Sequence, residues 1–233
     1  MNDVVPRHIG IIPDGNRRFS KHLMLKPWKG HEFGYQKFKR VIEWCKEYKI
    51  KEITIYAFSL ENFKRPKEEF DYLMKLFKEA FSELMTSKDK EKIENIKISF
   101  IGRLKLFPKE VQEKMRELAM QTKNNTPYKL NLAMAYSGQA EIVDTTKELI
   151  KKVQNGELKI EDIDESMFEK NLELSSEPDL IIRTSEKRLS GFLSYQSAYA
   201  ELIFVDKLWP EFEKEDFIEC LNEFSLRKRR FGG

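Results

Sequence analysis

Short apolar runs alternate with stretches of helical periodicity along almost the whole chain. The runs with strand character are His8–Ile12, Ile53–Phe58, Ile96–Ile101, Lys129–Tyr136, Leu180–Arg183 and Tyr199–Phe204. Apolar residues at helical spacing fill most of the gaps, as in the stripe from Phe70 to Met85. Parallel strands joined by crossover helices have this order. The sequence therefore predicts an α/β fold, with a central, mostly parallel six-stranded sheet flanked by helices on both faces.

The length and the connectors predict a single domain over residues 1–233. No internal repeat or low-complexity linker interrupts the alternation. With 17 Phe and 40 % hydrophobic residues, the chain can bury a core, which excludes a disordered protein. The most charged connector, Thr86–Asn95, is expected to form an exposed, mobile loop. The segment Asn155–Pro178 is expected to be a long irregular connection with short helical turns.

Charge and apolar content narrow the class of protein further. There are 42 Lys and Arg against 39 Asp and Glu, a near-balance that argues against a dedicated nucleic-acid binder. No apolar run approaches the roughly 20 residues of a membrane helix, and the N-terminus shows no signal-peptide pattern. The two cysteines form neither a disulfide framework nor a zinc pattern. We expect a cytoplasmic protein, and peripheral contact with the inner face of a membrane stays open.

Arginine is concentrated where the predicted strands end. The chain has 12 Arg and 30 Lys. Half of the arginines follow the carboxyl end of a strand: Arg17, Arg18, Arg65, Arg103, Arg183 and Arg188. Ligands of open α/β sheets bind at that edge, and guanidinium groups bind oxygen anions in a bidentate manner. For one arginine a surface ion pair is the simpler interpretation, but six at one edge favour a phosphate or diphosphate ligand.

A few other polar residues accompany these arginines. Asp14 lies in the first Arg-rich loop, where Mg²⁺ held by one or two carboxylates and phosphate oxygens would offset the repulsion between like charges. Capping of the following helix is the alternative role for Asp14. Glu201 on the last strand is a second candidate metal ligand, or otherwise a salt-bridge partner. His31, between Gly30 and Gly34, is a candidate phosphate donor, acid or base.

The motifs of the common phosphate-binding α/β enzymes are absent. The chain has no Gly-x-x-x-x-Gly-Lys-Ser/Thr loop, no Gly-x-Gly-x-x-Gly and no Gly-x-Ser-x-Gly elbow. The anion site is therefore of another type. The broad apolar stripe of residues 70–85, widened by Leu76 and Ala80, indicates either a buried core helix or one wall of an apolar tunnel beside that site. A diphosphate head beside a hydrocarbon slot describes a prenyl diphosphate.

Several segments, in the same order along the chain, resemble the cis-prenyltransferases, the undecaprenyl diphosphate synthase family. They are residues 8–18 (His-Ile-Gly-Ile-Ile-Pro-Asp-Gly-Asn-Arg-Arg), Gly30-His31, and residues 56–66, 182–185, 188–190, 196–201, 208–210 and 229–233. The Pro-Asp-Gly-Asn-Arg-Arg form is similar to that of archaeal members. The resemblance implies a Mg²⁺-dependent condensation of isopentenyl diphosphate with an allylic diphosphate, which forms a cis double bond and gives a (poly)prenyl diphosphate. It also implies a central parallel sheet with an apolar tunnel, and a homodimer.

The resemblance further implies roles for individual residues. Asp14 would bind Mg²⁺ and assist the departing allylic diphosphate, Glu201 would complete the metal site, and Asn62 or Asn16 would lie near the proton-abstraction step. The allylic substrate would contact Gly15, Asn16, Arg17, Arg18, Phe19, His31, Ser59, Leu60, Glu61, Phe63 and Arg65. Isopentenyl diphosphate would contact Arg183, Arg188, Leu189 and Ser190. The tail residues Arg230 and Gly232 would reach the diphosphate of the partner subunit.

The acceptor loop departs from the family pattern. From Arg183 to Ser190 it is one residue shorter, without the glycine of the family, and Pro27 and Phe19 also differ from common family residues. A second function stays open: a prenyltransferase of the same fold with a different acceptor or an irregular, non-head-to-tail coupling that gives a short product. Two further alternatives have less support. A non-catalytic subunit of a heteromeric prenyltransferase would lack the Asp-Gly-Asn loop, which is present here. A phosphate- or RNA-binding module would be supported only by the arginines at the strand ends and in the tail. Ala57 is compatible with a long product.

Overall fold

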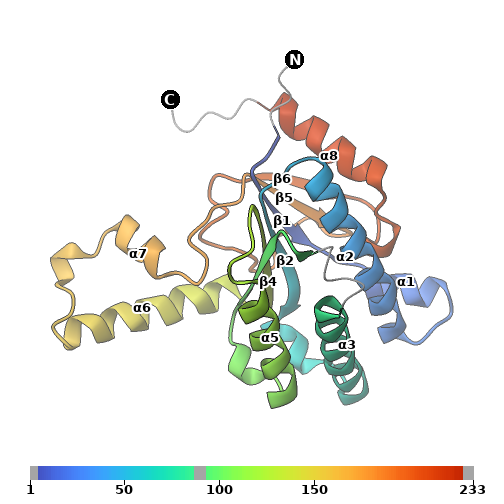
Figure 1. The fold of residues 1–233 in the computed structure, drawn as a ribbon. Helices are drawn as coiled ribbons and strands as arrows, with labels where there is room; N and C mark the ends of the chain where they lie inside the picture. Colours follow the sequence, from blue (N-terminus) through green and yellow to red (C-terminus); the bar gives the residue numbers. More distant parts are fainter. Residues whose placement is uncertain (1–4, 87–92, 228–233) are drawn as a thin grey trace.

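Six parallel strands form one central sheet in the computed structural model, which describes residues 5–86 and 93–227 (Figure 1). The strands are β1 (His8–Ile12), β2 (Glu52–Ser59), β3 (Ile96–Ile101), β4 (Tyr128–Tyr136), β5 (Leu180–Thr184) and β6 (Glu201–Val205). Their order is β3-β4-β2-β1-β5-β6, and every neighbouring pair is parallel. Each strand overlaps its predicted run, so the predicted fold class is confirmed.

The connecting segments are helical where the apolar spacing predicts helices. The α-helices are α1 (Asn16–His22), α2 (Gly30–Glu47), α3 (Lys67–Met85), α5 (Lys109–Thr122), α6 (Gly138–Gln154), α7 (Glu165–Asn171) and α8 (Lys214–Leu226). The 3-10 turns are η1 (Pro27–Lys29), η2 (Leu60–Lys64), η3 (Leu104–Leu106), η4 (Ile160–Asp162) and η5 (Trp209–Glu211). The irregular connection Asn155–Pro178 contains η4 and α7, as expected. The connector Thr86–Asn95 lies mostly outside the described residues.

The two faces of the sheet are covered differently. Alternate strand residues point to opposite faces, so Ile9 and Ile11 join a large core with α2, α3, α5 and α8, whereas Ile12 joins a smaller one. The smaller core is closed mainly by the irregular chain around Leu174 and Phe192. The prediction of helices on both faces is therefore correct for one face and only partly correct for the other.

Neither cysteine is in a disulfide, and both thiols are buried in the large core. Within residues 5–86 and 93–227, no helix combines the length and the apolar content needed to cross a bilayer. In an open parallel sheet of this kind, ligands bind where the loops leave the carboxyl ends of the strands.

Candidate active site

Two adjoining cavities open at the carboxyl ends of the strands. The first is polar and is lined by Ile12, Pro13, Asp14, Tyr56, Ser59, Glu61, Asn62, Arg65, Ser137, Gln139, Arg183, Ser190 and Gly191. The second runs between α2, α3 and the sheet. Pro13, Tyr56, Asn62 and Arg65 line both, so the two cavities share a wall. A ligand with a polar head and a hydrocarbon tail would fit this arrangement.

The second cavity is apolar and holds about 1000 Å³ of empty space, its open mouth included. One wall is the inner face of α3, with Leu73, Leu76, Phe77, Ala80, Phe81 and Leu84. Ala57 on β2 and Phe38 on α2 lie on other walls. Leu73 and Leu84 are buried in the large core and also line the cavity. The apolar stripe of α3 is thus both a core face and a cavity wall.

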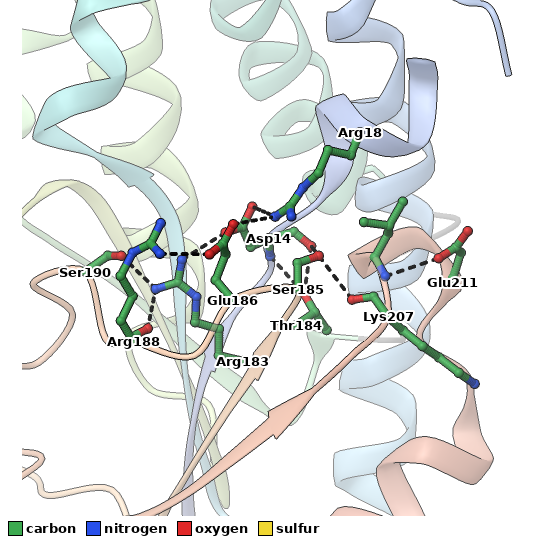
Figure 2. A network of polar contacts seen from close by, with 11 residues as sticks. Asp14, Arg18, Arg183, Thr184, Ser185, Glu186, Arg188, Ser190, Lys207 and Glu211 are labelled. Atoms are coloured by element: carbon green, nitrogen blue, oxygen red, sulfur yellow. Dashed lines mark hydrogen bonds and ion pairs between the residues drawn. The ribbon is translucent and has the colours of Figure 1, made fainter. Parts of the chain in front are cut away.

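Asp14 is held at the centre of the polar network drawn in Figure 2. Its backbone is fixed to the loop after β5, because its N–H donates to Thr184 Oγ1 (3.0 Å) and Thr184 Oγ1 donates back to its carbonyl (2.8 Å). Its carboxylate accepts from Arg183 Nη2 at 2.9 Å and from Arg18 Nη2 at 3.4 Å. Gly15, not Asp14, is the N-cap of α1, and no side chain caps that helix. The capping alternative for Asp14 is therefore wrong.

Gly15 has a backbone conformation that few other residues adopt. Its φ is 108°, and a Cβ there would lie 2.9 Å from the Cα of Leu208. The glycine therefore allows the first loop to turn sharply from β1 into α1 while packing against the segment that follows β6.

Three guanidinium groups converge beside Asp14 (Figure 2). Arg183 is 3 % exposed and donates to Ser190 Oγ at 2.7 Å. Arg18 and Arg188 both pair with Glu186, at 3.2 and 2.7 Å. The short acceptor loop therefore still brings Arg183, Arg188 and Ser190 together, as the sequence predicted.

A second charged cluster surrounds a residue that the sequence analysis missed. Glu69 on α3 is 1 % exposed, and its Oε1 accepts from Arg65 Nη1 at 2.5 Å. Arg17 Nε lies 3.6 Å from Oε2, and His31 Nε2 lies 3.1 Å from Arg65 Nη1 and 3.6 Å from Oε1 of Glu69. Glu69 therefore fixes all three predicted diphosphate ligands. The only sequence signal was its spacing four residues after Arg65, although Arg65 itself lies before the first residue of α3, Lys67.

The pKa values of this cluster follow from burial and from its charges. Contact with His31, aided by the positive charges of Arg65 and Arg17, lowers the pKa of Glu69 to about 2. Burial lowers the pKa of His31, so its ring is neutral at pH 7. A neutral imidazole and an ionised carboxylate leave Arg65 as a fixed cation at the wall shared by the two cavities.

The side-chain oxygens of the two predicted asparagines differ in their hydrogen bonding. Asn62 Oδ1 accepts from the backbone N–H of Ser59 at 3.1 Å and so caps η2. Asn16 Oδ1 is buried and accepts no hydrogen bond within the described residues. A Cβ at Gly34 would lie 2.3 Å from that oxygen, so the glycine makes room for it. Asn16 also lines the apolar cavity, so an unpaired acceptor belongs to a residue of the cavity wall.

Glu201 does not lie with Asp14. It is the first residue of β6 and pairs in register with Leu180, whereas Asp14 is bonded to Thr184, about 13 Å further along β5. Its carboxylate accepts from Arg227 Nη1 at 2.7 Å. Within one chain, the prediction that Glu201 completes the metal site of Asp14 is wrong. Nor does the part of the chain that the structure describes contain a group of three or more His, Cys, Asp or Glu side chains that could hold a metal.

Other predicted residues support the site rather than line its cavities. Leu60 and Phe63 pack against the large core, and Leu189 packs against the smaller one. Phe19 stacks edge-on with Phe33 at 5.2 Å. Arg103 follows β3 as predicted, but both arms of its guanidinium bind Asp144, and it lines neither cavity. Arg230 and Gly232 lie outside the described residues.

The fold and these cavities are suited to an α/β protein whose ligand has a polyanionic head group and a hydrocarbon tail. Comparison with known proteins agrees, because the Prenyltransf family model, that of undecaprenyl diphosphate synthase, matches residues 12–232. The chain belongs to this family of prenyltransferases, the cis-prenyltransferases, which condense isopentenyl diphosphate with an allylic diphosphate. The predicted family is therefore confirmed.

Individual relatives cover nearly the whole chain. A tritrans,polycis-undecaprenyl-diphosphate synthase (geranylgeranyl-diphosphate specific) of Pyrococcus abyssi is 47 % identical over 232 residues, 98 % of this chain and 88 % of the relative. An isoprenyl transferase of Thermus thermophilus is 46 % identical over 98 % of this chain and 89 % of its own length. The structure of lavandulyl diphosphate synthase from Lavandula x intermedia in complex with dimethylallyl diphosphate superimposes with a TM-score of 0.91, at 33 % identity and full coverage of both chains.

Proposed function

We propose that this prenyltransferase is Mg²⁺-dependent and extends an allylic primer with several isopentenyl units to give a polyprenyl diphosphate. The observation that carries the proposal is the wall shared by the polar and apolar cavities, with Asn62 and Arg65 on both. It lets the diphosphate of a growing chain stay among the arginines while its hydrocarbon extends along α3.

The two charged clusters suit two diphosphates. Arg17, His31 and Arg65, braced by Glu69, would hold the allylic diphosphate. Arg183, Arg188 and Ser190 would hold isopentenyl diphosphate. The allylic C–O bond breaks as the new C–C bond forms, and the departing diphosphate gains negative charge. Guanidinium groups that are already fixed stabilise that charge more in the transition state than in the ground state.

Asp14 fits the role of the Mg²⁺ ligand. Its carboxylate is about one-third exposed, lines the polar cavity and lies beside Arg18 and Arg183. A single carboxylate together with phosphate oxygens is a donor set that Mg²⁺ commonly accepts. When bound, the ion supplies further neutralisation of the departing diphosphate. Glu201 is left out of this site because of its place at the opposite end of the sheet.

We place Asn16, rather than Asn62, beside the carbon of the acceptor that loses its proton. The oxygen of Asn16 is buried in the wall of the apolar cavity and is not engaged by any described residue. The oxygen of Asn62 already caps η2. Asn62 would then act through its amide hydrogens, as a donor at the wall shared by the two cavities.

The primer we propose is geranylgeranyl diphosphate. The name of the Pyrococcus abyssi relative gives this specificity, and 47 % identity over 98 % of the chain supports its transfer. Ala57 lines the cavity with a small side chain, which agrees with a long hydrocarbon. A polyprenyl diphosphate of this kind is a precursor of lipid carriers.

The second candidate is a short or irregularly coupled product. It is favoured by the shortened acceptor loop and by the likeness to lavandulyl diphosphate synthase, whose structure contains dimethylallyl diphosphate. Against it, the loop closes through Ser185 and Ser190, both with positive φ (72° and 49°), and Arg183 still binds Ser190. The shorter loop therefore keeps its acceptor ligands in place.

The products distinguish these functions. The purified protein is incubated with Mg²⁺, isopentenyl diphosphate and, separately, dimethylallyl, farnesyl or geranylgeranyl diphosphate, and the products are analysed by mass spectrometry and NMR. We expect a ladder of five-carbon increments with cis double bonds, formed fastest from geranylgeranyl diphosphate. A single short product, or an irregular linkage, would favour the second candidate.

We also propose a homodimer, and the outer side of α6 supports it. Figure 1 shows α6 and α7 extending away from the sheet. Val143 and Ile150 on α6 are about half exposed, at 47 % and 50 %. An exposed apolar surface on a projecting helix is typical of a protein contact.

Val143→Asp is expected to weaken this dimer by at least about tenfold in Kd, because it places a charge in an apolar interface. Light scattering over a dilution series measures the molar mass. Met120→Asp, which changes a 64 % exposed residue on α5, is the matched control. If both variants dimerise as the parent protein does, α6 does not form the dimer interface.

Peripheral contact with the inner face of a membrane, from a cytoplasmic location, completes the proposal. The reason is chemical, since a long polyprenyl chain is insoluble in water and has to pass into a lipid phase.

A further inference from the structure

Residues 21–26, which end α1 and lead into η1, are all exposed. Three of them are large and apolar: Leu23 is 47 % exposed, Met24 95 % and Leu25 42 %. Nowhere else in residues 5–86 and 93–227 are two adjacent large apolar side chains both exposed. Single exposed apolar residues are ordinary on a protein surface, but three in sequence are not. Figure 1 shows this turn at the edge of the molecule, away from the sheet.

The turn is a defined structure that presents these side chains. Met24 N–H donates to the carbonyl of Lys21 (3.0 Å) and Leu25 N–H to that of Ser20 (2.9 Å), the pair of bonds that closes a Schellman motif. Ser20 Oγ also donates to the carbonyl of Pro27 at 2.8 Å. The chain is thus fixed on both sides of the three apolar residues.

Met24 stands where this motif prefers glycine. Its φ is 55°, in the left-handed region that disfavours a residue with a Cβ. The side chain that carries this conformational cost is also 95 % exposed, so it gains nothing from packing within the chain. Met24 therefore has an unfavourable backbone conformation that no contact within the chain offsets. Such a residue indicates a contact with another molecule.

The chain on both sides of the turn carries positive charge. Residues 15–31 contain five Lys and Arg and no Asp or Glu. In the part of the chain that the structure describes, neither Lys21 nor Lys26 forms an ion pair, whereas Lys29 is bound to Glu32 at 2.8 Å. Lys26 instead lies over the ring of Trp28, at 5.2 Å from its centroid. Cations that flank an exposed apolar tip complement an anionic surface.

We propose that residues 21–26, which we call the docking turn, insert into the interface of an anionic lipid bilayer. Leu23, Met24 and Leu25 would enter the acyl boundary, and Lys21 and Lys26 would remain at the level of the headgroups. An acidic protein would match the cations, but three unbranched or γ-branched apolar side chains that offer no backbone pairing or groove suit a fluid apolar phase better.

The position of the docking turn relates it to the active site. It ends α1, whose first residue, Asn16, lines the apolar cavity. Seven helical residues span about 10 Å, so docking would hold the cavity close to the bilayer. This part of the argument rests on the proposed function, because it is the polyprenyl product that needs a lipid phase.

Sedimentation with vesicles tests the proposal on the whole chain. Pure phosphatidylcholine vesicles are compared with vesicles in which about a third of the lipid is phosphatidylglycerol. We expect binding to the anionic vesicles that weakens as salt is added. The triple variant L23S/M24S/L25S should reduce the partition coefficient at least about tenfold, and K21E/K26E should do the same. Met120→Ser, an exposed change on α5, should bind as the parent protein does.

Met24→Gly separates docking from folding. Glycine relieves the left-handed backbone, so Tm should rise by about 2 °C while vesicle binding falls. A residue that only supported the fold would lose stability on this change. Failure of the parent protein to bind anionic vesicles, or equal binding by the parent and the triple variant, would overturn the proposal. A changed molar mass of the triple variant without changed vesicle binding would instead identify a protein contact.

Membrane docking and the proposed reaction can be tested separately by measuring turnover in detergent, without vesicles. L23S/M24S/L25S should keep the turnover of the parent protein there, because none of the three residues lines a cavity. If the parent binds vesicles through the turn but makes no polyprenyl product, the docking inference stands and the proposed product does not.

Discussion

Replacing Asp14 by asparagine is expected to lower kcat by at least about 100-fold while leaving the fold intact. The carboxylate is the only acid of the Pro13–Arg18 loop, and it lies between Arg18 and Arg183 at the polar cavity. Asparagine keeps the shape of the side chain and one acceptor oxygen, which can still bind Arg183, the closer of the two guanidinium groups. It removes the negative charge that a divalent cation requires, so chemistry should suffer much more than stability.

The measurement is kcat with saturating isopentenyl and allylic diphosphates over a titration of Mg²⁺. Asp14→Asn should need more Mg²⁺ for half-maximal turnover and should remain slow at any concentration. Asp71→Asn removes the same charge from an exposed position on α3 and should behave as the parent protein. Circular dichroism and Tm monitor folding. Parental turnover of a folded Asp14→Asn protein would remove Asp14 from the metal site.

The fold could be predicted closely because the chain alternates consistently and its connectors are short. The helix α6 shows where such reasoning fails. The apolar spacing predicts that Ile142, Val143, Leu149, Ile150 and Val153 form its buried stripe. Of these only Leu149 is buried, and the buried side also holds Glu141 and Thr145. Glu141 is tolerated there because it accepts from Tyr136 Oη at 2.5 Å, from Gln196 Nε2 at 3.1 Å and from backbone N–H groups. Gln196 and the backbone of Glu173 come from distant segments, so the apolar periodicity of the helix cannot predict these contacts.

The candidate site could be predicted for the residues that directly follow a strand. Asp14 and Arg183 follow strands directly, so their meeting at one edge of the sheet follows from parallel topology. Glu201 was misplaced because its role depends on register, which makes it the first residue of β6 and puts it at the opposite edge. Glu69 was missed because an acid on a helix, four residues after an arginine, has the pattern of an ordinary surface pair. Only the packing of α3 against the loops shows that it is buried.

Glu69→Gln is the second change for which we expect a large effect. Glutamine preserves the shape but leaves the positive charges of Arg65 and Arg17 without their partner. Both guanidinium groups, and His31 with them, should lose their fixed positions. We expect KM for the allylic diphosphate to rise about tenfold and kcat to fall less. KM for isopentenyl diphosphate should hardly change, because its proposed ligands lie in the other cluster.

Glu68→Gln is the matched control, since it removes the same charge from the neighbouring, exposed position. A positioning role predicts that Glu69→Asp restores part of the KM effect, because the charge is regained at a shorter reach. Equal changes in KM for both substrates, or a fall in kcat alone, would show that Glu69 acts on the fold or on the chemical step instead.

The acid dependence of stability provides an independent readout for Glu69. Its pKa is about 2 in the folded protein against 4.5 in the unfolded chain, so the carboxylate stabilises the fold above about pH 4.5. That contribution is lost progressively as the pH falls from 4.5 towards 2, as the unfolded chain binds the proton first. At neutral pH, loss of the buried carboxylate that pairs with the partly exposed Arg65 should lower the stability of Glu69→Gln by about 2–3 kcal/mol, or Tm by about 5–10 °C. The Tm gap between the two proteins should therefore narrow below pH 4.5. A gap that stays constant down to pH 3 would mean that the charge of Glu69 does not hold the cluster together.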